Sequence, residues 1–154
     1  MRTTLLIALM ACAPFGAVAA TPQEHVHGAA HEVMPFDMGK TLHIFAMNDD
    51  GGVQKVVVRD RADLDQVNLI QKHLQHEAAA FQNGDYGDPA HLHGQAMPGL
   101  AELREHASRV RVTYAPLPDG AEITFEARDR HTVTAIHRWF GAQLSEHGAD
   151  ARAE

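Results

Sequence analysis

Residues 41–59 read TLHIFAMNDDGGVQKVVVR and contain two apolar runs on either side of a turn. The first run, from Thr41 to Met47, and the second, from Val53 to Arg59, are rich in β-branched and aromatic side chains, which favour strands. Asn48-Asp49-Asp50-Gly51-Gly52 lies between them and is typical of a tight hairpin turn, because these residue types tolerate the backbone angles that such turns need. The segment therefore predicts an antiparallel β-hairpin at the start of the folded domain.

A long helix is predicted after this hairpin, from Ala62 to Phe81. Its apolar residues recur at helical spacing, and they are Val67, Ile70, Leu74, Ala78 and Phe81. Asp60 or Asp63 can cap the first turn, and Asn83-Gly84-Asp85 ends the helix. A short helix is expected further on, from Gly99 to Ala107.

The second half of the chain repeats the order strand, strand, helix. Alternating apolar and polar residues predict strands at Val110–Tyr114 and Ala121–Phe125, joined by a turn rich in proline and glycine. The last helix is expected from about Arg130 to Glu146, capped by Asp129 and ended by Gly148.

These elements fit a single α+β domain over residues 40–150. Two ββα units predict a four-stranded antiparallel sheet with both long helices packed on one face. After the first 20 of the 154 residues, the remaining chain is long enough for one domain with a real core and too short for two. The net charge of −7 argues against nucleic acid or an anionic lipid surface as a partner.

Residues 1–20 are typical of a secretory signal peptide. Met1-Arg2 is positively charged, an apolar segment follows, and the small residues Ala17-Val18-Ala19-Ala20 suit a signal peptidase. The apolar segment is too short to span a bilayer, so we expect a periplasmic protein without a membrane span. In the alternative, Leu9-Met10-Ala11-Cys12 serves as a lipobox and Cys12 is lipidated. Cys12 is the only cysteine, so the cleaved chain would have neither a disulfide nor a reactive thiol.

All 12 histidines follow the predicted signal peptide, which is a high content for a chain of this size. In an oxidising compartment without cysteine, imidazole and thioether groups are the good remaining ligands for transition metals. Residues 21–39 lack a sustained apolar period and are expected to form a flexible arm. This arm would act as an accessory chelator through its histidine and methionine side chains, which are His25, His27, His31, Met34 and Met38.

A loop is predicted from Tyr86 to Pro98, and it contains His91, His93 and Met97. On an extended chain, His-x-His places two imidazoles within reach of one ion, and a turn at Gly94 could bring the methionine beside them. Histidine with methionine suits copper, whereas zinc prefers histidine with carboxylate or cysteine. We therefore expect copper as the bound ion, with zinc as an alternative.

Three further histidines are expected to point inward from different elements. His43 shares a strand face with apolar side chains, His73 borders the apolar stripe of the first long helix, and His137 lies within the apolar stripe of the last helix. If both helices pack on one face of the sheet, these three can converge beneath the loop that carries His93 and Met97. The alternative for His137 is a core histidine whose ring is satisfied by a backbone carbonyl or an acid.

The function that these residues favour is periplasmic metal binding, for copper handling or tolerance. Non-covalent haem binding through His43 or His137 with Met97 is an alternative, since no Cys-x-x-Cys-His sequence is present. A small metal-dependent hydrolase is another, with Asp85 or Glu77 as the general base for a metal-bound water. A fourth alternative is a partner-binding module whose histidines change their charge at a pH of about 6.5.

Several stretches of the chain also resemble known sequences. They are Leu69–Leu74, Phe81–Asp85, His93–Leu100 and Ile136–Gly148. Together they resemble a group of small exported bacterial proteins without an assigned biochemical role, some of which carry the name aspartate carbamoyltransferase. That name implies an enzyme about twice this length with a Ser-Thr-Arg-Thr phosphate-binding motif, and this chain contains no such motif. The resemblance covers nearly the whole mature chain and implies no mechanism.

Overall fold

The computed structural model describes residues 21–154. The predicted signal peptide of residues 1–20, with Cys12, lies outside the described residues. In chain order, the helices are α1 (Pro22–Val33), α2 (Leu64–Gln82), α3 (Gly87–His93), α4 (Leu100–Glu105) and α5 (Arg130–His147). The strands are β1 (Thr41–Asn48), β2 (Gly51–Val58), β3 (Val110–Leu117), β4 (Gly120–Ala127) and β5 (Ala151–Ala153). Short 3-10 helices are η1 (Met38–Lys40), η2 (Ala107–Arg109) and η3 (Gly148–Asp150).

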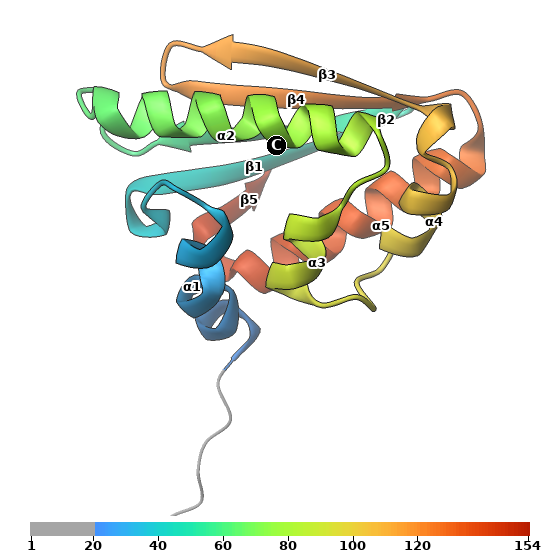
Figure 1. Cartoon of the computed structure of the whole chain (residues 1–154), viewed down its shortest axis with the longest axis horizontal. Helices are drawn as coiled ribbons and strands as arrows, with labels where there is room; N and C mark the ends of the chain where they lie inside the picture. The colour runs from blue at the N-terminus through green and yellow to red at the C-terminus, as the bar shows by residue number, and fades with distance from the viewer. Residues whose placement is uncertain (1–20) are drawn as a thin grey trace, which may run out of the picture.

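The strands form one five-stranded sheet in the order β3-β4-β2-β1-β5 (Figure 1). Two antiparallel hairpins, β1–β2 and β3–β4, join through an antiparallel pairing of β2 with β4. The predicted α+β class is confirmed, but the predicted four-stranded antiparallel sheet is wrong in detail. The fifth strand, β5, pairs in parallel with β1 and sets His43 opposite Ala151. The three residues of β5, Ala-Arg-Ala, are too few to show the alternation that predicts a strand. The strand is recognised only by its pairing with β1.

Both long helices cover the same face of the sheet. Phe125 on β4 contacts Phe81 from α2, with ring centroids 5.8 Å apart. The same ring contacts Trp139 and Phe140 from α5, at 5.3 and 5.6 Å. These aromatic pairs each contribute about 0.5–1.5 kcal/mol beyond the area they bury. The core therefore lies between this face and the two helices, and Figure 1 shows α2 lying along the sheet.

The segment expected to be a flexible arm instead forms α1. The helix begins with a capping box, in which the Thr21 hydroxyl accepts a hydrogen bond from the Glu24 amide and the Glu24 carboxylate accepts one from the Thr21 amide. Its apolar side is short, because only Val26 and Ala30 are buried. The helix packs against α3 and α5, so tertiary contact compensates for the weak periodicity that the sequence shows.

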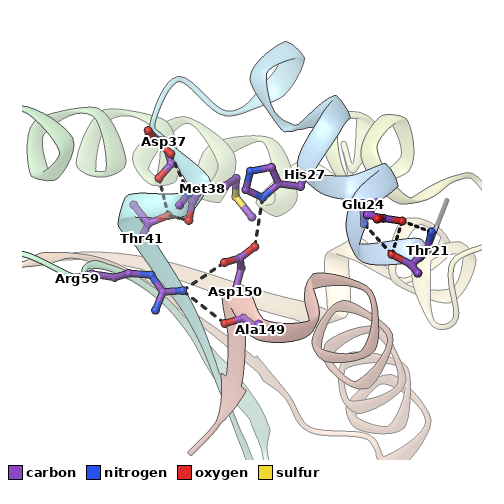
Figure 2. A network of polar contacts seen from close by, with 10 residues as sticks. Thr21, Glu24, His27, Asp37, Met38, Thr41, Arg59, Ala149 and Asp150 are labelled. Carbon is purple, nitrogen blue, oxygen red and sulfur yellow. Dashed lines mark hydrogen bonds and ion pairs between the residues drawn. The ribbon is translucent and has the colours of Figure 1, made fainter.

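The segment that follows α5 is tied to α1 and to the end of β2 through Asp150 in η3. One carboxylate oxygen lies 3.3 Å from His27 Nδ1 and the other lies 3.3 Å from Arg59 Nη2. Arg59 also donates to the Ala149 carbonyl at 3.4 Å. Figure 2 shows Asp150 between His27 and Arg59, so this network holds α1 against η3 and the residue that follows β2.

Among the residues from 21 onward, no helix is both long enough and apolar enough to cross a membrane.

Candidate functional site

A cavity of about 40 Å³ lies between the sheet and the helices α2, α3 and α5. Its walls combine apolar core side chains with an unusual number of polar ones. The polar residues are His43, Gln54, His73, Glu77, Asp88, His93, Gln143 and His147. Empty cavities in proteins are usually lined by apolar groups, and polar cavities hold water or ions. The composition of these walls therefore marks the cavity as the candidate site.

These residues meet because some share one face of the sheet and others share one side of a helix. His43 and Phe45 share one face of β1, and Gln54 pairs with Phe45 across the hairpin, so all three point towards the helices. His73 and Glu77 lie four residues apart on α2, which puts them on one side of that helix.

The remaining polar residues come from helix ends. Asp88 lies in the first turn of α3, and His93 is its last residue. His147 is the last residue of α5, with Gln143 one turn earlier. The C-terminal ends of α3 and α5 therefore meet one side of α2 and the sheet at the cavity.

His73, Glu77 and Asp88 form the group best arranged for a metal ion. Each offers one ligand atom, and the three atoms all lie within 4.8 Å of one another. Glu77 is 7% exposed, His73 is half-buried, and Asp88 is exposed. The group therefore runs from the cavity wall to the surface, and Asp88 forms its outer edge.

Burial controls the protonation of this group. Desolvation, followed by the neighbouring Asp88 carboxylate, raises the pKa of Glu77 to about 8. Desolvation also lowers the pKa of His73 to about 4, against the opposing charge of Asp88. At neutral pH the imidazole is thus in its neutral, ligating form, and Glu77 holds a proton that a cation would displace.

Three histidines form a second group deeper in the cavity. The His147 ring stacks on His43 with centroids 4.6 Å apart and planes 22° apart, and it meets His93 edge-on at 5.0 Å. His43 and His147 are 2% and 1% exposed, and the His93 side chain is 1% exposed. His93 Nδ1 lies 2.7 Å from a carboxylate oxygen of Glu146. We call His43, His93 and His147 the histidine cluster.

Several buried polar atoms around this cluster have no hydrogen-bond partner among the described residues. They are both ring nitrogens of His147, Nδ1 of His43, Oε1 of Gln54, Nε1 of Trp139 and Nε2 of Gln143. All of these residues line the cavity. An unsatisfied buried polar atom costs about 1–3 kcal/mol, so a protein rarely retains several at one place.

The histidine cluster is neutral at physiological pH. Desolvation first, and then the neighbouring histidines, lower the pKa of His43 to about 4 and that of His147 well below its ordinary range. Desolvation lowers the pKa of His93 too, and the Glu146 carboxylate opposes this shift. Neutral imidazoles carry free lone pairs, which are the form that metal ions bind.

The structure places His43, His73 and His93 on the cavity, as the sequence predicts, but it places His137 elsewhere. His137 Nε2 donates to the Asn48 and Gly51 carbonyls at the β1–β2 turn, at 3.0 and 2.8 Å. His137 is therefore a histidine satisfied by backbone carbonyls, and its expected convergence with His43 and His73 is corrected. His147, about 15 Å further along the same helix, occupies the place expected for it.

The expected grouping of His91, His93 and Met97 is also corrected. The predicted loop forms α3, and residues two apart on a helix point in different directions. His91 is exposed and its Nε2 lies 2.7 Å from a Glu32 oxygen on α1. Met97 packs in the hydrophobic core and is not part of the cavity wall.

Three histidines of α1 are exposed and do not line the cavity, namely His25, His27 and His31.

Sequence reasoning missed Asp88, Glu146 and His147 as site residues. The spacing of His73 and Glu77 on one helix is a signal that points to a shared site, because residues four apart lie on the same side of a helix. Nothing local marks His147, since its position depends on where α5 ends against β1.

No family model, no curated protein and no solved structure matches this chain.

Proposed function

We propose that the protein binds a divalent transition-metal ion through His73, Glu77 and Asp88. The observation that carries this proposal is the mutual separation of their ligand atoms, which is at most 4.8 Å. Metal–ligand bonds of about 2.0–2.2 Å put donor atoms on one ion roughly 3–4 Å apart. Small side-chain rotations therefore suffice to close the three groups on an ion.

The charges of the group support the same proposal. Two carboxylates balance the charge of a divalent ion. The buried Glu77 carboxyl holds a proton at neutral pH, and a cation that replaces this proton is a stronger partner for the carboxylate. The competing explanation is a carboxylic acid–carboxylate pair, in which Glu77 shares its proton with Asp88 and no ion binds. The two explanations differ in what happens when a metal is added.

One imidazole with two carboxylates is a donor set that suits Zn²⁺ and other borderline divalent ions. Cu²⁺ also accepts nitrogen and oxygen donors, and it generally binds such sites more tightly than Zn²⁺ does. The copper expectation that rested on Met97 gains no support, since this side chain lies away from the cavity. Together with the predicted export signal, the site supports a role in periplasmic metal handling, with zinc or copper as the ion.

The size of the cavity favours an ion over haem. Sites for drug-sized or cofactor-sized ligands measure about 300–1,000 Å³. A cavity of about 40 Å³ has room for an ion with a few waters. A porphyrin would have to displace core side chains.

The proposal is tested by calorimetric titration of the EDTA-treated protein, purified without a histidine tag, with Zn²⁺ and Cu²⁺. We expect one site at this group, with an affinity that falls at least tenfold in Glu77→Gln and in Asp88→Asn. His76→Gln is the matched control, because His76 lies one residue before Glu77 on the same helix and is exposed. Equal affinities in the wild type and both carboxylate variants would leave only the shared-proton explanation.

A further inference from the structure

The histidine cluster lies in the same cavity as the proposed divalent site and uses different side chains. His43 comes from β1, His93 from the end of α3, and His147 from the end of α5. His147 is in contact with both of the others, at 4.6 and 5.0 Å between ring centroids. Three separate elements thus direct imidazoles to one buried point.

Three ring nitrogens of the cluster, two on His147 and one on His43, lack the partners that a structural role would give them. All three are buried and have no hydrogen-bond partner in the described chain. His137 on the same helix shows the contrast, because two backbone carbonyls satisfy its Nε2. A leucine at position 147 would fill a similar volume without this cost. The cluster therefore directs ring nitrogens that no described protein group satisfies into a cavity.

His93 has the second feature of a metal ligand. Its Nδ1 lies 2.7 Å from the Glu146 carboxylate, which fixes the proton on that nitrogen and leaves the lone pair on Nε2. A carboxylate in this position orients a metal-bound imidazole and increases its basicity. Glu146 itself is partly exposed, at the edge of the buried cluster.

We infer that the histidine cluster is a second metal site, which binds a monovalent d¹⁰ ion, Cu(I), through two or three imidazoles. Neutral ligands with one nearby carboxylate balance a single positive charge. A divalent ion there would pay a far larger desolvation cost, since that cost grows with the square of the charge. Imidazole is a good ligand for copper, and Cu(I) accepts the low coordination numbers that two or three rings provide.

Binding requires a local rearrangement. Within the described residues, only the His73 group has three ligand atoms mutually within 4.8 Å. At least one ring of the cluster must therefore rotate about its χ2 angle so that the nitrogens face one ion. The stacked pair His43–His147 is the place for this rotation, because its unpartnered nitrogens form no hydrogen bond that would oppose it.

The test is an anaerobic titration of the whole exported protein with Cu(I), in competition with a chromophoric Cu(I) chelator. We expect one Cu(I) per chain, an affinity at least 100-fold lower in His147→Leu, and an affinity about 10-fold lower in Glu146→Gln. Glu146→Gln changes a partly exposed residue, so it keeps the measurement valid if His147→Leu fails to fold. His76→Gln is the control for binding by surface histidines.

Zn²⁺ titrations separate this inference from the proposed divalent site. His147→Leu should keep the wild-type Zn²⁺ affinity, while Glu77→Gln should keep the wild-type Cu(I) affinity. X-ray absorption of the Cu(I)-loaded wild type should show only nitrogen neighbours, two or three of them at about 2 Å. Wild-type Cu(I) affinity in both His147→Leu and Glu146→Gln, or sulfur in the first shell, would overturn the inference.

Discussion

His147 is the single residue whose placement is hardest to explain by packing alone. Its imidazole is 1% exposed, and neither ring nitrogen has a hydrogen-bond partner in the described part of the chain. A residue of this kind lowers the stability of the metal-free protein, and we infer that metal binding is why it is there. The effect of His147 on the free energy of unfolding can be measured.

We predict that His147→Leu raises the free energy of unfolding of the metal-free protein by about 1–3 kcal/mol, because it removes two unsatisfied buried polar atoms. His137→Leu should lower it by about 1–2 kcal/mol, since the His137 ring hydrogen bonds to the Asn48 and Gly51 carbonyls. Urea unfolding in EDTA measures both changes. Destabilisation by His147→Leu would mean that the ring has partners in solution.

Glu77 gives a pH-dependent prediction at the same scale. Its folded pKa of about 8 lies above the ordinary value of 4.5, so the folded state holds a proton that the unfolded state releases. The stability that Glu77 contributes is complete below about pH 4.5 and is lost as the pH rises through about 8. We expect Glu77→Gln to raise the melting temperature of the metal-free protein more at pH 8 than at pH 5. An equal change at both values would contradict a buried, protonated Glu77.

At the scale of elements, α1 is the part of the fold that most needs a test. Val26 is buried in it, and Gly28 lies in the same helix with open space around it, since a Cβ added there would meet no atom within 4 Å. We predict that Val26→Asp lowers the free energy of unfolding by about 2–4 kcal/mol, because it buries a charge without a partner. Gly28→Ala should raise it by about 0.5–1 kcal/mol. An unstructured arm would leave thermal unfolding unchanged in both variants.

The elements also show how far the sequence alone can predict the fold. The two hairpins and the two long helices appear where alternation and helical spacing predict them, with α2 at Leu64–Gln82 and α5 at Arg130–His147. Three short elements, α1, α3 and β5, escape prediction, because their apolar sides are small and their stability comes from neighbours. Of these, only α1 has a local signal, the capping box of Thr21 and Glu24.

The candidate site is predictable to the same extent. Periodicity gives the direction of a side chain around a helix, and it correctly turns His73 inward. It does not give the position along the helix relative to the sheet, so it selects His137 although His147 is the residue beside His43. Asp88 and Glu146 become recognisable only when α3 and α5 are placed in space.

For the whole molecule, the buried groups predict that the metal-free protein is most stable at about pH 6.5. Folded pKa values of about 4 for His43 and His73 lie below the ordinary 6.5, so their contribution is present above about pH 6.5 and is lost as the pH falls towards 4. Glu77 acts in the opposite direction between about pH 4.5 and 8. Melting temperatures from pH 4.5 to 8.5 in EDTA measure this curve, and a continuous rise up to pH 8.5 would show that Glu77 is ionised.

The most direct measurement of the central claim is anomalous diffraction at the zinc edge, from crystals of the untagged protein grown with Zn²⁺. We predict an anomalous peak about 2.0–2.2 Å from a ring nitrogen of His73 and from a carboxylate oxygen of Glu77 and of Asp88. Data collected below the edge provide the control for the identity of the ion. A map with no peak at this group, in which a direct hydrogen bond joins the carboxyl groups of Glu77 and Asp88, would contradict the proposed metal site.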